Sequence, residues 1–202
     1  MSDELTPWWA GENFWRKAAV WVTSVMVLIL IFLTFHSLKS ISSGSERVPD
    51  YTVINKRIYY SFDEEKNWKV PVIGDDAPLF NTAYSPQEAE ALVRKGKLVI
   101  QGRNCMNCHT LLGNGAYYAQ DLTKAWLDPA WGAEVVREQL MLAFLMDPVA
   151  NARGYGTRRK MPNLNLSEEE ARATIAYLKW MSSIDTNGFP YGFNAISQQG
   201  EE

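Results

Sequence analysis

The feature that most constrains how this chain can fold is the run from Ala18 to Leu38, which contains no Asp, Glu, Lys or Arg. A helix over these residues would rise about 31 Å, close to the hydrocarbon thickness of a bilayer. Tryptophans crowd its N-terminal end, as in an interfacial aromatic belt. We therefore expect a transmembrane helix over residues 18–38. The alternative is a cleaved signal peptide, although the apolar region of a signal peptide is shorter.

A second constraint is the motif Cys105-Met106-Asn107-Cys108-His109. C-x-x-C-H is the attachment signature of a c-type haem, in which both thiols bond to one porphyrin and the adjacent histidine binds the iron. The chain has two cysteines in all, which excludes a four-thiolate zinc site. A dithiol redox site is the alternative, but no β-α-β pattern surrounds the motif. We predict one covalent haem c on Cys105 and Cys108, with His109 as an axial ligand.

The sixth iron ligand must come from another residue type, because the only other histidine, His36, lies in the predicted span. Methionine is the common alternative. Five methionines follow the span: Met106, Met141, Met146, Met161 and Met181. Met161 precedes Pro162 in a loop, which restricts its backbone to extended conformations and suits a fixed ligand. We predict Met161; Met146 and an open site remain alternatives.

Four basic residues, Arg153, Arg158, Arg159 and Lys160, precede this methionine. They would form either a solvated loop or a cluster that pairs with haem propionates and steers an acidic donor. With both axial positions of the iron filled, no substrate could bind there, and we predict no catalytic residue. The net charge of −3 gives no reason to invoke nucleic acid.

Local sequence signals predict an all-α domain after the span. Ser85 and Glu88 form a capping box for a helix to about Gly102. A second helix is expected over residues 133–146, and a third begins after Ser167, with Glu170 completing another capping box. Residues 51–62 and 68–74 are β-leaning and form a hairpin or extended arm that packs on a partner or on the haem domain. The predicted segments are 1–17 cytoplasmic, 18–38 transmembrane, 39–80 linker and arm, 81–187 cytochrome c domain, and 188–202 polar tail.

Orientation does not follow from charge, because basic residues flank both ends of the span almost equally. Haem c is attached on the outer side of the bacterial plasma membrane. We therefore expect the N-terminus in the cytoplasm and the haem domain in the periplasm. His36 would be an interfacial histidine or a ligand of a membrane haem shared with another chain.

The run from Gly102 to Ala119 contains C-x-x-C-H-T-L-L-G-x-G-A-Y. This run resembles the small cytochrome c subunit of bacterial nitric oxide reductase. The resemblance covers residues 85–182 well and 12–38 loosely, and it does not extend to residues 45–80. The run from Asp121 to Lys124 also resembles the cytochrome-like part of single-chain, quinol-oxidising reductases, which leaves the electron donor open.

The resemblance implies a multi-span partner with b-type haems and a non-haem iron, which reduces two NO to N2O. The small subunit would accept electrons from a soluble cytochrome c or a cupredoxin. The resemblance also implies a calcium ion at the subunit interface, bound through backbone carbonyls at Gly115 and Tyr117; a tight turn is the alternative there. Alternatives for the whole chain are a free-standing membrane-anchored electron shuttle, the cytochrome c subunit of an oxygen reductase, and a gas sensor with a labile Met161.

Overall fold

A computed structural model describes residues 7–45, 47–152 and 159–192. Four helices carry the architecture: α1 (Glu12–Ile41), α2 (Pro86–Gly102), α3 (Glu134–Met146) and α4 (Glu168–Ser182). A hairpin of β1 (Lys56–Asp63) and β2 (Trp68–Asp76) precedes α2, and a two-residue pair, β3 (Thr110–Leu111) with β4 (Asn114–Gly115), follows it. The fold is therefore mainly helical, as the sequence predicts.

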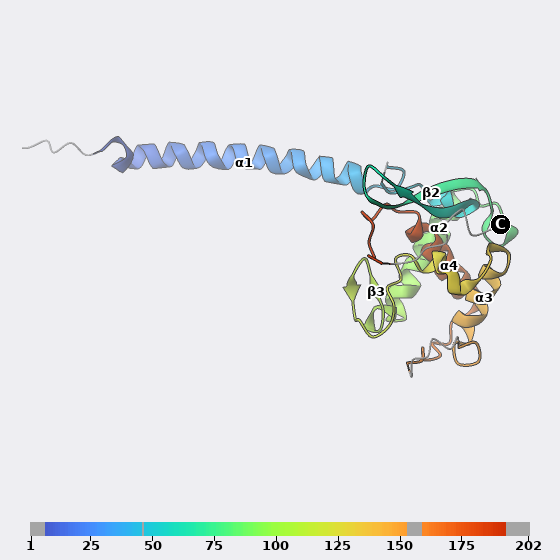
Figure 1. Ribbon diagram of the computed structural model, residues 1–202. Coiled ribbons are helices and arrows are strands. Elements are labelled where there is room, and N and C mark those ends of the chain that lie inside the picture. Colours follow the sequence, from blue (N-terminus) through green and yellow to red (C-terminus); the bar gives the residue numbers. More distant parts are fainter. Residues whose placement is uncertain (1–6, 46, 153–158, 193–202) are drawn as a thin grey trace, which may run out of the picture.

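Helix α1 projects from the rest of the chain as one long rod (Figure 1). It contains the predicted span, and an 18-residue window within it has a mean hydropathy of 2.5 with none of its residues buried. Its hydroxyl groups bond back into the helix: Thr34 Oγ1 donates to the Leu30 carbonyl at 2.7 Å, and Ser40 Oγ to the His36 carbonyl at 3.0 Å. Such bonds satisfy the hydroxyl groups of an apolar helix within the helix itself. Among the described residues it is the one helix long and apolar enough to cross a membrane.

Both predicted capping boxes are confirmed. At the start of α2, the Glu88 amide donates to Ser85 Oγ at 3.4 Å, and the Ser85 amide donates to Glu88 Oε2 at 2.8 Å. At the start of α4, the corresponding distances between Ser167 and Glu170 are 3.2 and 2.9 Å. Each box satisfies two backbone donors that the first turn of a helix leaves unpaired. These caps explain why both helices begin where the sequence predicts.

The core of the domain lies between α2 and α4, which cross at Gly96. Val93 and Ile100 from α2 and Ile175 and Tyr177 from α4 are buried and belong to one hydrophobic cluster. Trp126, from the 3-10 turn Ala125–Leu127, is fully buried beneath α4. The two helices thus hold the start of the haem motif, which follows α2 directly, against the main core.

The hairpin belongs to this core. Ile58 and Tyr60 of β1 are 3% and 5% exposed and join the same buried cluster as α2 and α4. Arg57 pairs with Glu134 of α3 at 2.8 Å. Of the two placements that the sequence leaves open, the structure shows packing on the haem domain. The strand begins at Lys56 and not near residue 51, because Tyr51–Asn55 form a 3-10 turn that buries Val53 and Ile54.

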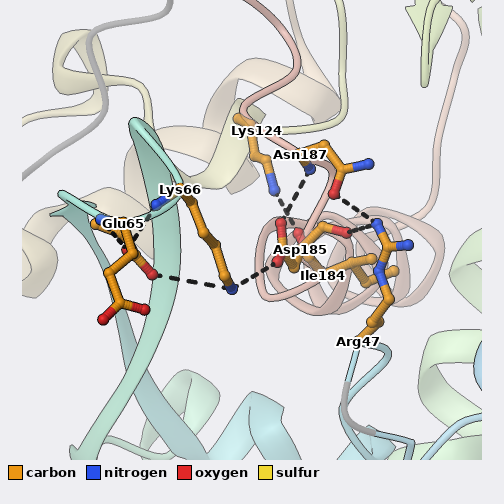
Figure 2. Close-up of polar contacts among 8 residues, drawn as sticks. Arg47, Glu65, Lys66, Lys124, Ile184, Asp185 and Asn187 are labelled. Atoms are coloured by element: carbon orange, nitrogen blue, oxygen red, sulfur yellow. Dashed lines mark hydrogen bonds and ion pairs between the residues drawn. The ribbon is translucent and has the colours of Figure 1, made fainter.

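The chain segment after α4 ties the linker and the hairpin together (Figure 2). Arg47 of the linker donates to the Asn187 side chain at 2.8 Å, and Lys66 of the hairpin turn pairs with Asp185 at 3.5 Å. Surface pairs of this kind contribute little stability individually. Together they fix where the linker that follows α1 meets the domain.

Two lysine side chains are buried in the domain. Lys124 donates to the Ile184 carbonyl at 2.7 Å (Figure 2), and Lys179 donates to the Ala77 carbonyl at 2.8 Å. Both residues are at most 1% exposed. Burial lowers the pKa of Lys124 to about 7 and that of Lys179 to about 8. Each amine therefore anchors a distant carbonyl, at the cost of a desolvated charge when it is protonated.

Candidate haem site

The end of α2 delivers the chain directly to the two cysteines. Asn104 adopts a left-handed conformation, with φ of 55°, which turns the backbone out of the helix. Cys105 and Cys108 then share one 3-10 turn, in which the Cys108 amide donates to the Cys105 carbonyl at 3.2 Å. The turn therefore presents two partly buried thiols together, as attachment to one porphyrin requires.

The Cys105 thiol lacks the lowered pKa of a reactive dithiol site. Burial raises the pKa of Cys105 above its ordinary value. Reactive cysteines in disulfide oxidoreductases have the opposite property, a lowered pKa that maintains the thiolate. Together with the histidine that follows, this favours the haem interpretation over the dithiol alternative.

His109 is oriented by the loop opposite. Its Nδ1 lies 2.8 Å from the Gln120 carbonyl oxygen. Because a carbonyl accepts only, Nδ1 carries the hydrogen and Nε2 keeps its lone pair. Metal-binding histidines are held in this way, with one nitrogen fixed by an acceptor and the other directed at the metal. The residues present thus fit a haem whose iron is bound by His109 Nε2.

Met161 lies in the irregular segment that leads to α4, and it is partly buried. Its neighbour Arg159 donates to the Tyr118 carbonyl at 2.6 Å and stacks over the Tyr118 ring at 5.0 Å. This contact fastens the methionine segment to the loop that follows the haem motif. The role of Met161 as the sixth ligand stays a prediction. Of the predicted basic cluster, Lys160 is exposed, and Arg153 and Arg158 lie outside the described residues.

The other methionines have structural explanations of different kinds. Met141 and Met181 are 2% and 3% exposed and belong to the core cluster, as their helical spacing suggests. Met146 ends α3 and is 39% exposed. Met106 lies within the motif, and its carbonyl accepts from the Ala116 amide at 3.0 Å. Met161 and Met146 are thus the two methionines after the span whose positions are explained by neither core packing nor the motif.

The positions predicted to bind calcium lie on the loop beside the motif. A β-carbon at Gly115, where φ is 131°, would collide with the His109 carbonyl, so glycine is required there for steric reasons alone. The Tyr117 hydroxyl donates to the Gly113 carbonyl at 2.8 Å, and its ring is largely exposed. Within the described residues no group of three or more His, Cys, Asp or Glu side chains could hold a metal ion. The tight-turn alternative therefore accounts for Gly115, and the calcium site remains a prediction.

Sequence reasoning missed several residues that shape this site. Arg103, which caps α2, forms a two-pronged ion pair with Glu170 of the α4 capping box at 2.8 and 2.9 Å. Asp121 accepts hydrogen bonds from three groups around the haem loop. The Asp-x-Thr pattern at residues 121–123 is typical of an Asx turn and could have pointed to Asp121. No local signal predicts the Arg103 pair, because its partner is 67 residues away.

Comparison with known proteins agrees with this geometry. Residues 93–182 match the cytochrome c family. The mainly helical fold, the C-x-x-C-H turn and this match define a protein with a cytochrome c domain, preceded by one candidate membrane helix. The particular protein that it resembles is the C subunit of nitric oxide reductase.

The chain is 41% identical over 101 residues to the nitric oxide reductase C subunit from Stutzerimonas stutzeri, a match that covers 50% of this chain and 65% of the relative. The equivalent proteins from Cereibacter sphaeroides and Paracoccus denitrificans are 36% and 33% identical, over 47% and 48% of this chain and 63% and 64% of their own length. The matches thus span less than two thirds of each relative. They confirm the resemblance that the sequence around Cys105 predicts.

Proposed function

We propose that this protein is the electron-entry subunit of a nitric oxide reductase. In this proposal it accepts electrons from a soluble cytochrome c or cupredoxin and passes them to a multi-span catalytic subunit that carries b-type haems and a non-haem iron. The observation that carries the proposal is the His109 imidazole, held by the Gln120 carbonyl beside a C-x-x-C turn. The chain around it is similar to the C subunits of three nitric oxide reductases.

The residues assigned to the haem each have one task. Cys105 and Cys108 would hold the porphyrin through thioether bonds, and the His109 imidazole and the Met161 thioether would bind its iron. The haem supplies a one-electron redox centre. A thioether opposite an imidazole raises the reduction potential and leaves no position for substrate. The subunit thus transfers electrons, and the reduction of NO takes place on its partner.

The proposal places the chain in the bacterial plasma membrane. Residues 1–17 lie in the cytoplasm, and the span over residues 18–38 lies within α1. The linker and hairpin of residues 39–80, the cytochrome c domain of residues 81–187 and the tail of residues 188–202 lie in the periplasm. The hairpin packs on the domain through Ile58 and Tyr60, so it would move with the haem domain as one body.

The decisive experiment is purification of the tagged full-length chain from its native membranes. We expect a haem that stays with the polypeptide in acidified organic solvent, together with a co-purified protein that carries b-type haem and consumes NO. Replacement of both cysteines by alanine is the matched control, and it should abolish the covalent haem stain. A covalent haem on a subunit that purifies alone would support the free-standing shuttle. A co-purified oxygen-consuming partner would support the oxygen reductase alternative, and release of the haem into solvent would refute the whole assignment.

Calcium is the second cofactor in the proposal, bound at the subunit interface through the carbonyls of Gly115 and Tyr117. Ca²⁺ prefers oxygen ligands, and backbone carbonyls serve as such. Treatment of the purified complex with a calcium chelator should then separate the two subunits, and added Ca²⁺ should restore them. A complex that remains intact and contains no calcium by elemental analysis would leave Gly115 with its steric role alone.

A further inference from the structure

Two stretches of chain run side by side at the candidate haem site: residues 108–113, which include β3, and residues 119–123. The Ala119 amide donates to the Cys108 carbonyl, and the Leu122 amide donates to the Thr110 carbonyl, both at 2.8 Å. The bond between His109 Nδ1 and the Gln120 carbonyl lies between these two. The orientation of the imidazole therefore depends on how firmly the two stretches are held together.

The carboxylate of Asp121 reinforces these backbone bonds with side-chain bonds between the two stretches. Asp121 Oδ2 accepts from Thr110 Oγ1 at 2.7 Å and from the Gly113 amide at 3.1 Å, and Oδ1 accepts from the Thr123 amide at 2.8 Å. Charge-assisted bonds of this kind are about twice as strong as neutral ones. Thr110 is 2% exposed and Thr123 is fully buried, so water competes little for the two threonines.

The Asp121 carboxylate is placed so that it can control the orientation of His109. Thr110 directly follows His109, and Asp121 directly follows Gln120, so the Thr110–Asp121 bond lies one residue beyond the imidazole–carbonyl bond on both stretches. We propose that Asp121 is a positioning residue that keeps the Gln120 carbonyl on His109 and thereby lowers the reduction potential of the haem. This inference rests on the proposed function, because it takes His109 as the iron ligand.

The physical reason is the effect of an acceptor on the imidazole. A fixed carbonyl at Nδ1 makes Nε2 a more basic ligand, which stabilises the oxidised iron relative to the reduced iron. If the bonds of Asp121 are removed, the Gln120 carbonyl can move away from Nδ1. The imidazole then becomes a less basic ligand, and the reduced iron is stabilised relative to the oxidised iron. A residue that only holds the loop together would change the free energy of unfolding without changing the balance between oxidised and reduced iron.

Paired substitutions at Thr110 separate the two roles. Thr110→Val removes the hydroxyl that reaches Asp121 and keeps the shape of the buried side chain, whereas Thr110→Ser keeps the hydroxyl. Asp121→Asn changes the carboxylate itself. The amide group of asparagine would face a backbone N–H that now donates a hydrogen bond to the carboxylate. Asp128→Asn is the control, since Asp128 caps a backbone amide, that of Ala130 at 2.9 Å, but does not contact His109.

The measurements are potentiometric titration and the NMR shifts of the His109 ring protons in the full-length oxidised protein. We expect Thr110→Val and Asp121→Asn to raise the reduced-to-oxidised ratio at a fixed potential about tenfold, which corresponds to 59 mV for one electron. The His109 shifts should move in the same variants. Thr110→Ser and Asp128→Asn should match the wild type in both measurements.

Two results would overturn the inference in distinguishable ways. If the wild-type protein holds a low-spin covalent haem and all four variants share its potential and its His109 shifts, Asp121 only staples the loop and the proposed function stands. If the wild-type protein holds no covalent haem, the proposed function fails and the inference fails with it.

Discussion

Gly96 of α2 lies directly against the Ala173 carbonyl of α4, so close that a β-carbon at position 96 would overlap the carbonyl oxygen. The Cβ of Tyr177 would also lie only 2.8 Å from that added β-carbon. Glycine in a helix interior costs about 0.5–1 kcal/mol relative to alanine, so its presence in α2 needs a compensating reason. The close approach of the two helices supplies that reason, and it holds α2, and hence the turn that bears the cysteines, against α4.

Gly96→Ala should therefore destabilise the domain despite the better helix propensity of alanine. The obstacle is backbone, which cannot rotate away, so we expect a loss of about 1–3 kcal/mol in the free energy of unfolding. Urea denaturation followed by circular dichroism measures it. Gly102→Ala, at the end of the same helix, is the control, because a β-carbon there has no neighbour within 4 Å. Equal stability of the two variants would contradict the tight crossing.

Met161→Ala should open the sixth coordination position of the haem. Without the thioether the iron loses one axial ligand. The reduced variant should therefore lose the low-spin spectrum in the absence of CO, and it should bind CO when CO is added. Optical spectra of the reduced full-length protein, with and without CO, make the comparison. Met146→Ala is the matched control, since Met146 is the other methionine outside the core and the motif. CO binding by wild type and Met161→Ala alike would favour the gas-sensor alternative.

Much of the helical framework could be predicted from the sequence because its signals are local. Ser85 with Glu88, and Ser167 with Glu170, specify the starts of α2 and α4 within four residues of chain. Helical spacing likewise assigns Met141 and Met181 to the core, where they lie. The thiols and the histidine of the site could likewise be predicted from the sequence, since they form one continuous motif.

The remaining features join residues that are far apart in the chain. The Lys179 ammonium meets a carbonyl 102 residues away, and no periodicity marks a lysine in an apolar stripe as buried and bonded. The β-leaning composition around Ile58 predicts a strand, but only the packed structure shows which surface covers it. The Asx turn from Asp121 to the Thr123 amide follows a local pattern, but the bonds of Asp121 to Thr110 and Gly113 depend on a loop geometry that the sequence does not specify.

Ile58→Ala should destabilise the whole domain if the hairpin is part of its core. Ile58 is 3% exposed, and removal of such a side chain leaves a cavity that typically costs about 2–5 kcal/mol. Urea denaturation of the full-length protein measures the loss. Phe62→Ala, on the same strand, is the control: its ring is 56% exposed, so we expect a change within about 0.5 kcal/mol. A neutral Ile58→Ala would indicate a hairpin that serves only as a contact surface for a partner.

The buried ammonium of Lys124 should make stability rise with pH above neutrality. Burial lowers its pKa from 10.5 to about 7 in the folded protein. Between these two values the unfolded chain binds one more proton than the folded chain, so raising the pH favours folding by about 1.4 kcal/mol per pH unit. Below pH 7 the amine is charged in both states, and this contribution to stability is absent. The free energy of unfolding in urea, measured at several pH values across this window, gives the slope.

Lys124→Met should remove this slope and leave the one that comes from Lys179, whose pKa of about 8 gives the same slope over a narrower pH window. Methionine keeps most of the side-chain volume without a titratable group, so the comparison isolates the proton. Lys97→Met, on the exposed face of α2, is the control and should keep the wild-type slope. If Lys124→Met also keeps it, the amine must stay protonated in the folded state. The bond to the Ile184 carbonyl and the charge of Asp185 would then outweigh its desolvation.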